Sequence, residues 1–95
     1  MVQLDLNLVK QISYSQAFEK IAIKLKKKDR TLFDQLSVQI EKTIRIPSIG
    51  KPLRYTLKNR RRLHVGSFVL VYEFYDSELR FIDFDHHDKI YKKYK

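Results

Sequence analysis

Three side chains that suit work on a phosphodiester recur at alternate positions of one short stretch, Arg60, Arg62 and His64. If this segment is an extended strand, the spacing of two places all three side chains on one face of a sheet. Guanidinium groups can clamp a phosphate in bidentate fashion, and an imidazole exchanges a proton near neutral pH. The pattern therefore predicts a site that binds a phosphodiester and transfers a proton.

Cleavage of RNA without a metal ion needs a base for the 2′-hydroxyl, an acid for the leaving 5′-oxygen, and positive charge near phosphorus. His64 is the candidate base, and Arg60 and Arg62 are the candidate clamp. His87 could act as the acid, while Tyr91 could stack on a nucleobase or carry a proton. The alternative interpretation is a solvated docking strand with an exposed histidine, and a tyrosine that only packs against the sheet.

The charge of the chain points to a polyanionic partner. Twenty Lys and Arg residues against eleven Asp and Glu give a formal net charge of +9. Most of the positive charge lies in three clusters, at residues 24–30, 54–62 and 89–95. This clustering favours a nucleic acid or an acidic protein as the partner over a merely well-solvated surface. The residues that we expect to contact RNA phosphates are Lys26, Lys27, Lys58, Arg61, Lys89 and Lys92.

The composition excludes several classes of function. The chain contains no Cys, which rules out disulfides and thiolate chemistry and fits a reducing compartment. Two glycines are too few for a nucleotide-binding loop, and we expect no cofactor. The first residues lack the order of a signal peptide, and no apolar run approaches the roughly 18 residues of a membrane span. We therefore expect a cytoplasmic protein.

The stretch from Asp83 to Asp88, DFDHHD, raises the alternative of a metal site. Neighbouring residues of a strand point to opposite faces, so only alternate members such as Asp83, Asp85 and His87 could converge on an ion. Apart from His64, the sequence offers no matching set of ligands elsewhere. We therefore predict no bound metal.

The elements that must position these residues follow from the apolar periodicity. Residues 1–95 are expected to form one domain, with residues 1–8 as an N-terminal extension and a short strand near residues 8–14. Ser13-x-x-Gln16 fits a capping box, and Thr31 can start a second helix that ends near Arg45, before two prolines. The apolar positions at helical spacing are Ala17, Phe18, Ile21, Ala22 and Leu25, then Phe33, Leu36, Ile40 and Ile44.

Beyond these helices the apolar period changes to two. It predicts strands at residues 55–65, 68–75 and 79–84, with hairpin turns at Gly66-Ser67 and Asp76-Ser77 and a last helical turn at residues 88–94. The fold class is therefore α+β: a short N-terminal strand, a helical hairpin and a three-stranded antiparallel meander, with the helices on one sheet face. Because Leu63 and Val65 alternate with the basic row, that row belongs on the open face.

Three motifs at their mutual spacing resemble the RelE/ParE superfamily of toxins. They are GKPLR at residues 50–54, RxLxVGxFxLVYE at residues 61–73 and HHDKIY at residues 86–91, and the resemblance covers residues 10–93. It implies a RelE-like fold and a small toxin that a cognate antitoxin neutralises. RelE-type members resemble ribonucleases that enter the ribosomal A site and cut mRNA. ParE-type members share the fold but poison DNA gyrase.

The resemblance also assigns roles residue by residue. Arg60 and Arg62 stand at the two basic positions of the strand before the tight turn, and Tyr91 stands at the terminal tyrosine. Three positions depart from the RelE pattern, in which arginine is usual: here they are His64, Val69 and His87.

Two functions follow from these matches and departures. The first is a ribosome-dependent mRNA endoribonuclease that inhibits translation, with the ribosome, mRNA and a cognate antitoxin as partners. The second is a non-enzymatic interaction protein on the same fold, either a gyrase inhibitor or an inactive relative. In both cases we expect the antitoxin to lay an amphipathic, acid-rich segment on the basic sheet face and the helical hairpin.

Overall fold

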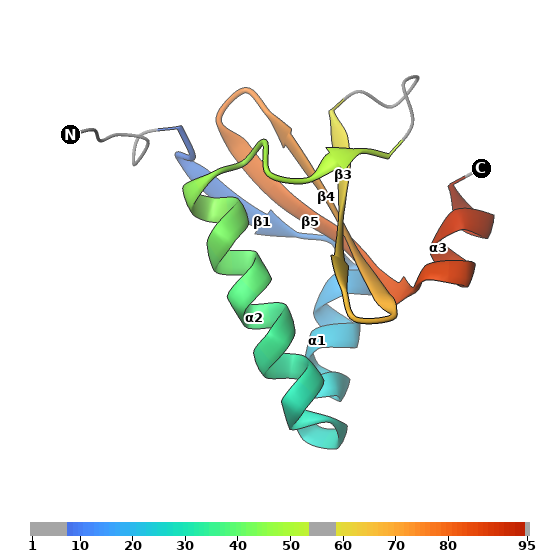
Figure 1. Ribbon diagram of the computed structural model, residues 1–95. Helices are drawn as coiled ribbons and strands as arrows, with labels where there is room; N and C mark the ends of the chain where they lie inside the picture. The colour runs from blue at the N-terminus through green and yellow to red at the C-terminus, as the bar shows by residue number, and fades with distance from the viewer. Residues whose placement is uncertain (1–7, 54–58, 95) are drawn as a thin grey trace.

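A computed structural model describes residues 8–53 and 59–94 of the chain, and Figure 1 shows the arrangement of its elements. In chain order the elements are β1 (Gln11–Tyr14), α1 (Gln16–Lys28), α2 (Arg30–Arg45), β2 (Lys51–Pro52), β3 (Arg60–Val65), β4 (Phe68–Tyr75), β5 (Glu78–His86) and α3 (His87–Lys93). The α+β class and the order of the predicted elements are confirmed, and β2 is a short strand that was not predicted. Residues 55–58 of the predicted strand 55–65 lie outside the described residues. Among these helices, none has the length and apolar character needed to cross a bilayer.

The strands form one mixed sheet in the order β1-β5-β4-β3-β2. The meander from β3 to β5 is antiparallel, whereas β1 pairs with β5 in parallel. Both predicted hairpin turns are present, and the backbone there adopts positive φ values, 62° at Gly66, 52° at Asp76 and 67° at Ser77. Ile82 forms a β-bulge in β5, because Val71 of β4 pairs with Asp83 and the next residue, Tyr72, pairs with Phe81.

Both long helices begin at residues other than those predicted. The cap of α1 is Ser15, whose Oγ accepts a hydrogen bond from the Phe18 N–H at 3.0 Å. Ser13 instead lies in β1, and its hydroxyl donates to a carboxylate of β5. The cap of α2 is Asp29 rather than Thr31. Ser13 lies in the sheet because β1 pairs with β5. This pairing joins residues far apart in the chain, so a local capping motif cannot predict it.

The helical hairpin covers one face of the sheet, and α3 lies on the other (Figure 1). Under α1 and α2 a core forms from Phe18, Leu36, Val65, Leu70, Tyr72, Leu79, Phe81 and Phe84. Ala17 was expected in the apolar stripe but is exposed. On the other face, Ile90 of α3 packs with Leu53, Val69 and Val71 in a second, smaller cluster.

The buried Tyr72 hydroxyl anchors the segment that leads from α2 to the sheet edge. It donates to the Pro47 carbonyl at 2.7 Å and accepts from the Gly50 N–H at 2.8 Å. Burial raises the pKa of this phenol, so it stays a neutral donor. A Cβ on Gly50 would lie 2.7 Å from the Arg62 carbonyl oxygen, so only glycine allows this approach. The anchor therefore sets the position of β2 beside the basic strand.

Candidate active site

The basic row projects from the sheet face that the helical hairpin leaves uncovered. Arg60, Arg62 and His64 lie opposite Glu73, Val71 and Val69 of β4, and cross-strand partners share a face. Leu63 and Val65, which alternate with this row in β3, pack into the core under the hairpin. The structure therefore places the basic row on the sheet face that the alternation in the sequence predicted.

Both arginines are held in place by α3 and by acceptors of the sheet. The Arg60 guanidinium lies 5.9 Å from the ring centroid of Tyr94, and its Nε lies 3.8 Å from a carboxylate oxygen of Glu73. The Arg62 guanidinium lies 5.8 Å from the ring centroid of Tyr91. One of its nitrogens donates to the Pro52 carbonyl at 3.0 Å. A guanidinium carries five N–H donors, so a group held this way can still bind a phosphate.

His87 and Tyr91 extend this site along α3. Their ring centroids are 6.3 Å apart, and Tyr91 in turn meets Arg62. The His87 ring also stacks on His86 at 4.9 Å, and its Nδ1 lies 3.0 Å from a carboxylate oxygen of Asp88. The His87 side chain is 44% exposed and Tyr91 is 41% exposed. Arg62, Tyr91 and His87 thus form a connected and accessible line on the open face.

His64 shares the face but stands apart from that line. It is exposed, and within residues 8–53 and 59–94 its imidazole makes no hydrogen bond or ion pair. Its cross-strand partner Val69 is fully buried and packs with Ile90 of α3. The position where the RelE pattern has an arginine is therefore filled by an apolar side chain beneath a helix.

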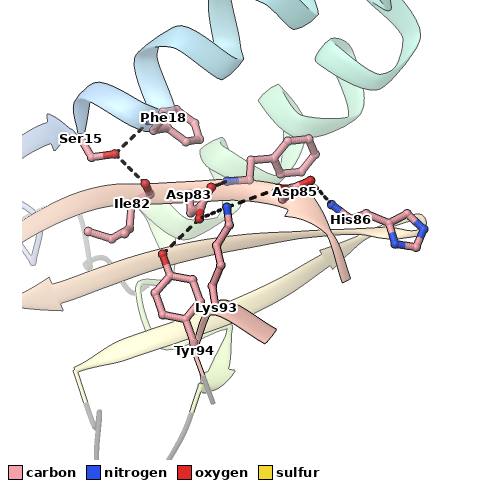
Figure 2. A network of polar contacts seen from close by, with 9 residues as sticks. Ser15, Phe18, Ile82, Asp83, Asp85, His86, Lys93 and Tyr94 are labelled. Atoms are coloured by element: carbon pink, nitrogen blue, oxygen red, sulfur yellow. Dashed lines mark hydrogen bonds and ion pairs between the residues drawn. The ribbon is translucent and has the colours of Figure 1, made fainter. Parts of the chain in front are cut away.

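A carboxylate network that sequence reasoning missed fixes α3 on the sheet. Lys93 Nζ lies 2.9 Å from Asp83 and 3.3 Å from Asp85, and the Tyr94 hydroxyl donates to Asp83 at 3.1 Å (Figure 2). The hydrogen bond to Asp83 raises the Lys93 pKa. Burial, together with the Asp83 charge, raises the Tyr94 pKa. The network holds the rings of α3 over the arginines.

The acidic residues and histidines of residues 83–88 do not form the metal site that the sequence raised as an alternative. Asp83 and Asp85 face Lys93 and do not converge with His87. Within the described ranges, one group has ligand atoms within 4.8 Å of one another, His86, His87 and Asp88. Its imidazoles already contact the Asp88 carboxylate and backbone, and the aspartate is exposed. The contacts of these three side chains at the start of α3 explain why they lie close together.

The other predicted RNA contacts have different surroundings. Arg61 points to the hairpin side of the sheet, where its guanidinium donates to the Gly50 carbonyl at 2.6 Å and supports the segment before β2. Lys26 and Lys27 are exposed in the last turn of α1. Lys89 and Lys92 are exposed on α3. Lys58 lies outside the described residues.

Comparisons with known proteins agree with this architecture. The family model described as "ParE toxin of type II toxin-antitoxin system, parDE" matches residues 12–91. A protein of Methanocaldococcus jannaschii that bears the name toxin RelE4 is 36% identical over 88 residues, which cover 90% of this chain and 94% of that protein.

Two solved structures share the fold. A chain of the Escherichia coli DinJ-YafQ toxin-antitoxin complex superposes with a TM-score of 0.72 at 25% identity, covering 86% of this chain and 97% of the other. The YoeB/ParE toxin of Agrobacterium tumefaciens superposes with a TM-score of 0.74 at 15% identity, covering 82% and 99%. The second similarity concerns the fold alone.

Proposed function

The chain belongs to the ParE-toxin family of type II toxin–antitoxin systems, and from this premise we propose that it cuts mRNA on the ribosome and that a cognate antitoxin holds it inactive. The observation that carries the nuclease proposal is the connected line of Arg62, Tyr91 and His87 on the open sheet face. It combines a phosphate ligand, a stacking ring and a proton donor within one accessible surface.

Each side chain has a role that its surroundings support. Arg62, with Arg60 beside it on β3, binds the scissile phosphate and stabilises the charge that grows on it. Tyr91 stacks on a nucleobase and fixes the nucleotide next to His87, which protonates the leaving 5′-oxygen. His64, exposed on the same face, is the base for the 2′-hydroxyl. No step needs a metal ion.

The exposed lysines supply contacts with ribosomal RNA. Lys26 and Lys27 lie at the end of α1, and Lys89 and Lys92 lie on α3 beside the site. Such phosphate contacts carry no sequence information but orient the protein on its target. For single-stranded RNA, binding should weaken with salt at a slope of about −0.7 per phosphate neutralised.

The helical hairpin offers an apolar surface for the antitoxin. A groove of about 490 Å³ lies between α1 and α2, and its lining includes Tyr14, Ala22, Ile23, Phe33 and Ile40. Ile23 is 60% exposed and Tyr14 is 45% exposed, so a partner that covered this surface would remove apolar area from water. An amphipathic helix with acidic residues at its edge would fit both this groove and the basic charge of the chain.

The test is cleavage of a defined mRNA on translating ribosomes, with new 5′ ends mapped by primer extension. His87→Ala and Arg62→Ala should each lower the cleavage rate about 100-fold or more, because each removes a group that acts in the transition state. Arg45→Ala is the matched control, since this exposed arginine at the end of α2 lies outside the site. Undiminished cleavage by a His64→Ala/His87→Ala double variant would eliminate both histidines from the mechanism.

One observation favours the non-enzymatic alternative. The position at which RelE-like nucleases usually carry an arginine is Val69, which is fully buried beneath α3 and offers no group to a phosphate. A gyrase inhibitor on this scaffold would need no such arginine. Inhibition of DNA supercoiling by the purified protein, without new 5′ ends in mRNA, would reverse the preference.

A further inference from the structure

A series of aromatic rings runs from the candidate site around the end of the sheet to a basic groove on the other side. We propose that this ring ladder, made of Tyr91, His87, His86 and Phe68, with the buried Phe84 supporting Phe68 from the core, is a second subsite for single-stranded RNA that binds nucleotides flanking the cleaved bond. The proposal rests on the proposed nuclease function, because it extends the path of the same RNA strand.

The rings follow one another at stacking distance. The centroids of His87 and His86 are 4.9 Å apart at an interplanar angle of 29°. His86 meets Phe68 edge-on at 5.8 Å, and Phe68 stacks on Phe84 at 5.2 Å and 19°. With the contact of His87 to Tyr91, the ladder is continuous from the open face to the hairpin face. Because His86 is the last residue of β5, the ladder passes around the strand end.

The far end of the ladder opens into a groove with positive charge. This groove of about 310 Å³ is lined by Ile21, Lys24, Leu25, Lys28, Phe68, Phe84 and Asp85. It is accessible because β1 pairs with β5 only as far as Phe81, so the next part of β5 is not covered by a strand on this side. The two lysines lie on α1 one helical turn apart and are both exposed.

The single acidic side chain of the groove does not cancel this charge. One carboxylate oxygen of Asp85 lies 3.3 Å from Lys93 Nζ, and the other accepts the His86 N–H at 2.8 Å. The carboxylate is therefore already compensated by groups of β5 and α3. Lys24 and Lys28 remain as the charged groups that an incoming phosphate would meet.

Aromatic faces flanked by lysines are the combination that binds single-stranded nucleic acid. Bases stack on the rings regardless of sequence, and the lysines neutralise the backbone. Phe68, which lines the groove, contacts His86, and His86 contacts His87 of the candidate site, so a strand whose phosphate lies at Arg62 can continue along the ladder. An acidic antitoxin segment is the other occupant that this charge would admit, and the experiment separates the two.

The experiment measures binding of 2′-O-methyl RNA, which cannot be cut, by fluorescence anisotropy with the full chain. A three-nucleotide probe can occupy only the open face, whereas a nine-nucleotide probe can also reach the groove. Lys24→Glu/Lys28→Glu should weaken nine-nucleotide binding about fivefold or more and leave three-nucleotide binding unchanged. Lys42→Glu is the control for a charge reversal on an exposed helix position away from the groove.

A second variant addresses stacking without changing charge. Phe68→Leu keeps an apolar side chain in this partly buried position but removes the ring between His86 and Phe84, and it should weaken the longer probe about fivefold or more. Photocrosslinking of 5-iodouridine placed at the ends of the longer probe should then label His86 or Phe68 in the wild-type chain.

The outcomes separate this inference from the proposed function. If Arg62→Ala weakens both probes while the groove variants bind like wild type, the subsite is wrong and the open-face site stands. If wild-type protein binds neither probe in a salt-dependent manner, the RNA function itself fails, and the subsite with it. If the groove variants lose only an acidic antitoxin peptide, the groove belongs to the antitoxin.

Discussion

Replacement of Tyr72 by Phe tests whether the buried hydroxyl positions the basic strand. The change removes one oxygen and leaves the ring in the core, but the Pro47 carbonyl and the Gly50 N–H lose their partner. Both of these residues are buried. A buried polar group without a partner costs about 1–3 kcal/mol. For two such groups, with some entry of water, we expect Tyr72→Phe to lower the free energy of unfolding by about 2–4 kcal/mol.

Urea unfolding followed by circular dichroism measures this loss. With an m value of about 1–2 kcal/mol/M, the midpoint should fall by at least about 1 M while m stays constant. Tyr75→Phe is the matched control, because Tyr75 is 66% exposed and loss of its hydroxyl should cost less than about 0.5 kcal/mol. Equal midpoints for the two variants would refute the anchoring role.

The same variant has a consequence for the site. The segment anchored by Tyr72 leads to Pro52 and Leu53, whose carbonyls accept from the Arg62 guanidinium. Release of that segment should loosen Arg62 and weaken RNA binding, even under conditions in which the variant is fully folded. Unchanged RNA binding by folded Tyr72→Phe would show that the arginine is positioned without this segment.

Further predictions concern packing, pH and the antitoxin. Gly50→Ala places a Cβ 2.7 Å from the Arg62 carbonyl oxygen, and thermal unfolding should reveal a loss of about 1–3 kcal/mol. The Lys93 pKa lies above its ordinary value of 10.5, so the ion pairs of the charged lysine contribute fully to stability below pH 10.5. This contribution is lost as the pH rises through the pKa of the folded state. Urea midpoints measured between pH 8 and 11.5 should therefore fall only at the alkaline end. Asp83→Asn removes the charge that holds this lysine, and amide hydrogen exchange should become faster in α3. Ile23→Asp should weaken antitoxin binding at least about tenfold in calorimetry and leave mRNA cleavage unchanged, since Ile23 lines the hairpin groove far from the catalytic residues in the fold.

Much of the fold could be predicted because its signals are local. Alternation of apolar residues fixed which side chains of β3 point to the core, and this placed Arg60 and Arg62 on the open face. The turn at Gly66 also follows from local chemistry, since its φ of 62° suits glycine. The end of α2 at Arg45 agrees with the prolines that follow it.

The site could be predicted less completely, because its side chains are brought together by contacts distant in the sequence. Arg61 and Arg62 look equivalent in the chain, yet one supports the segment before β2 and the other meets Tyr91 on the opposite face. The roles of Asp83 and Lys93 depend on how α3 lies on the sheet. No pattern in the sequence specifies that placement.

The amino-acid sequence by itself determined the α+β class, the hairpin turns and the face of β3 that carries the basic row, because periodicity and turn chemistry act over a few residues. Only the tertiary structure decided that β1 joins β5 in parallel, that α3 lies over Val69, and that Tyr91 meets both Arg62 and His87. These features depend on burial of apolar area and pairing of charges between segments that are far apart along the chain.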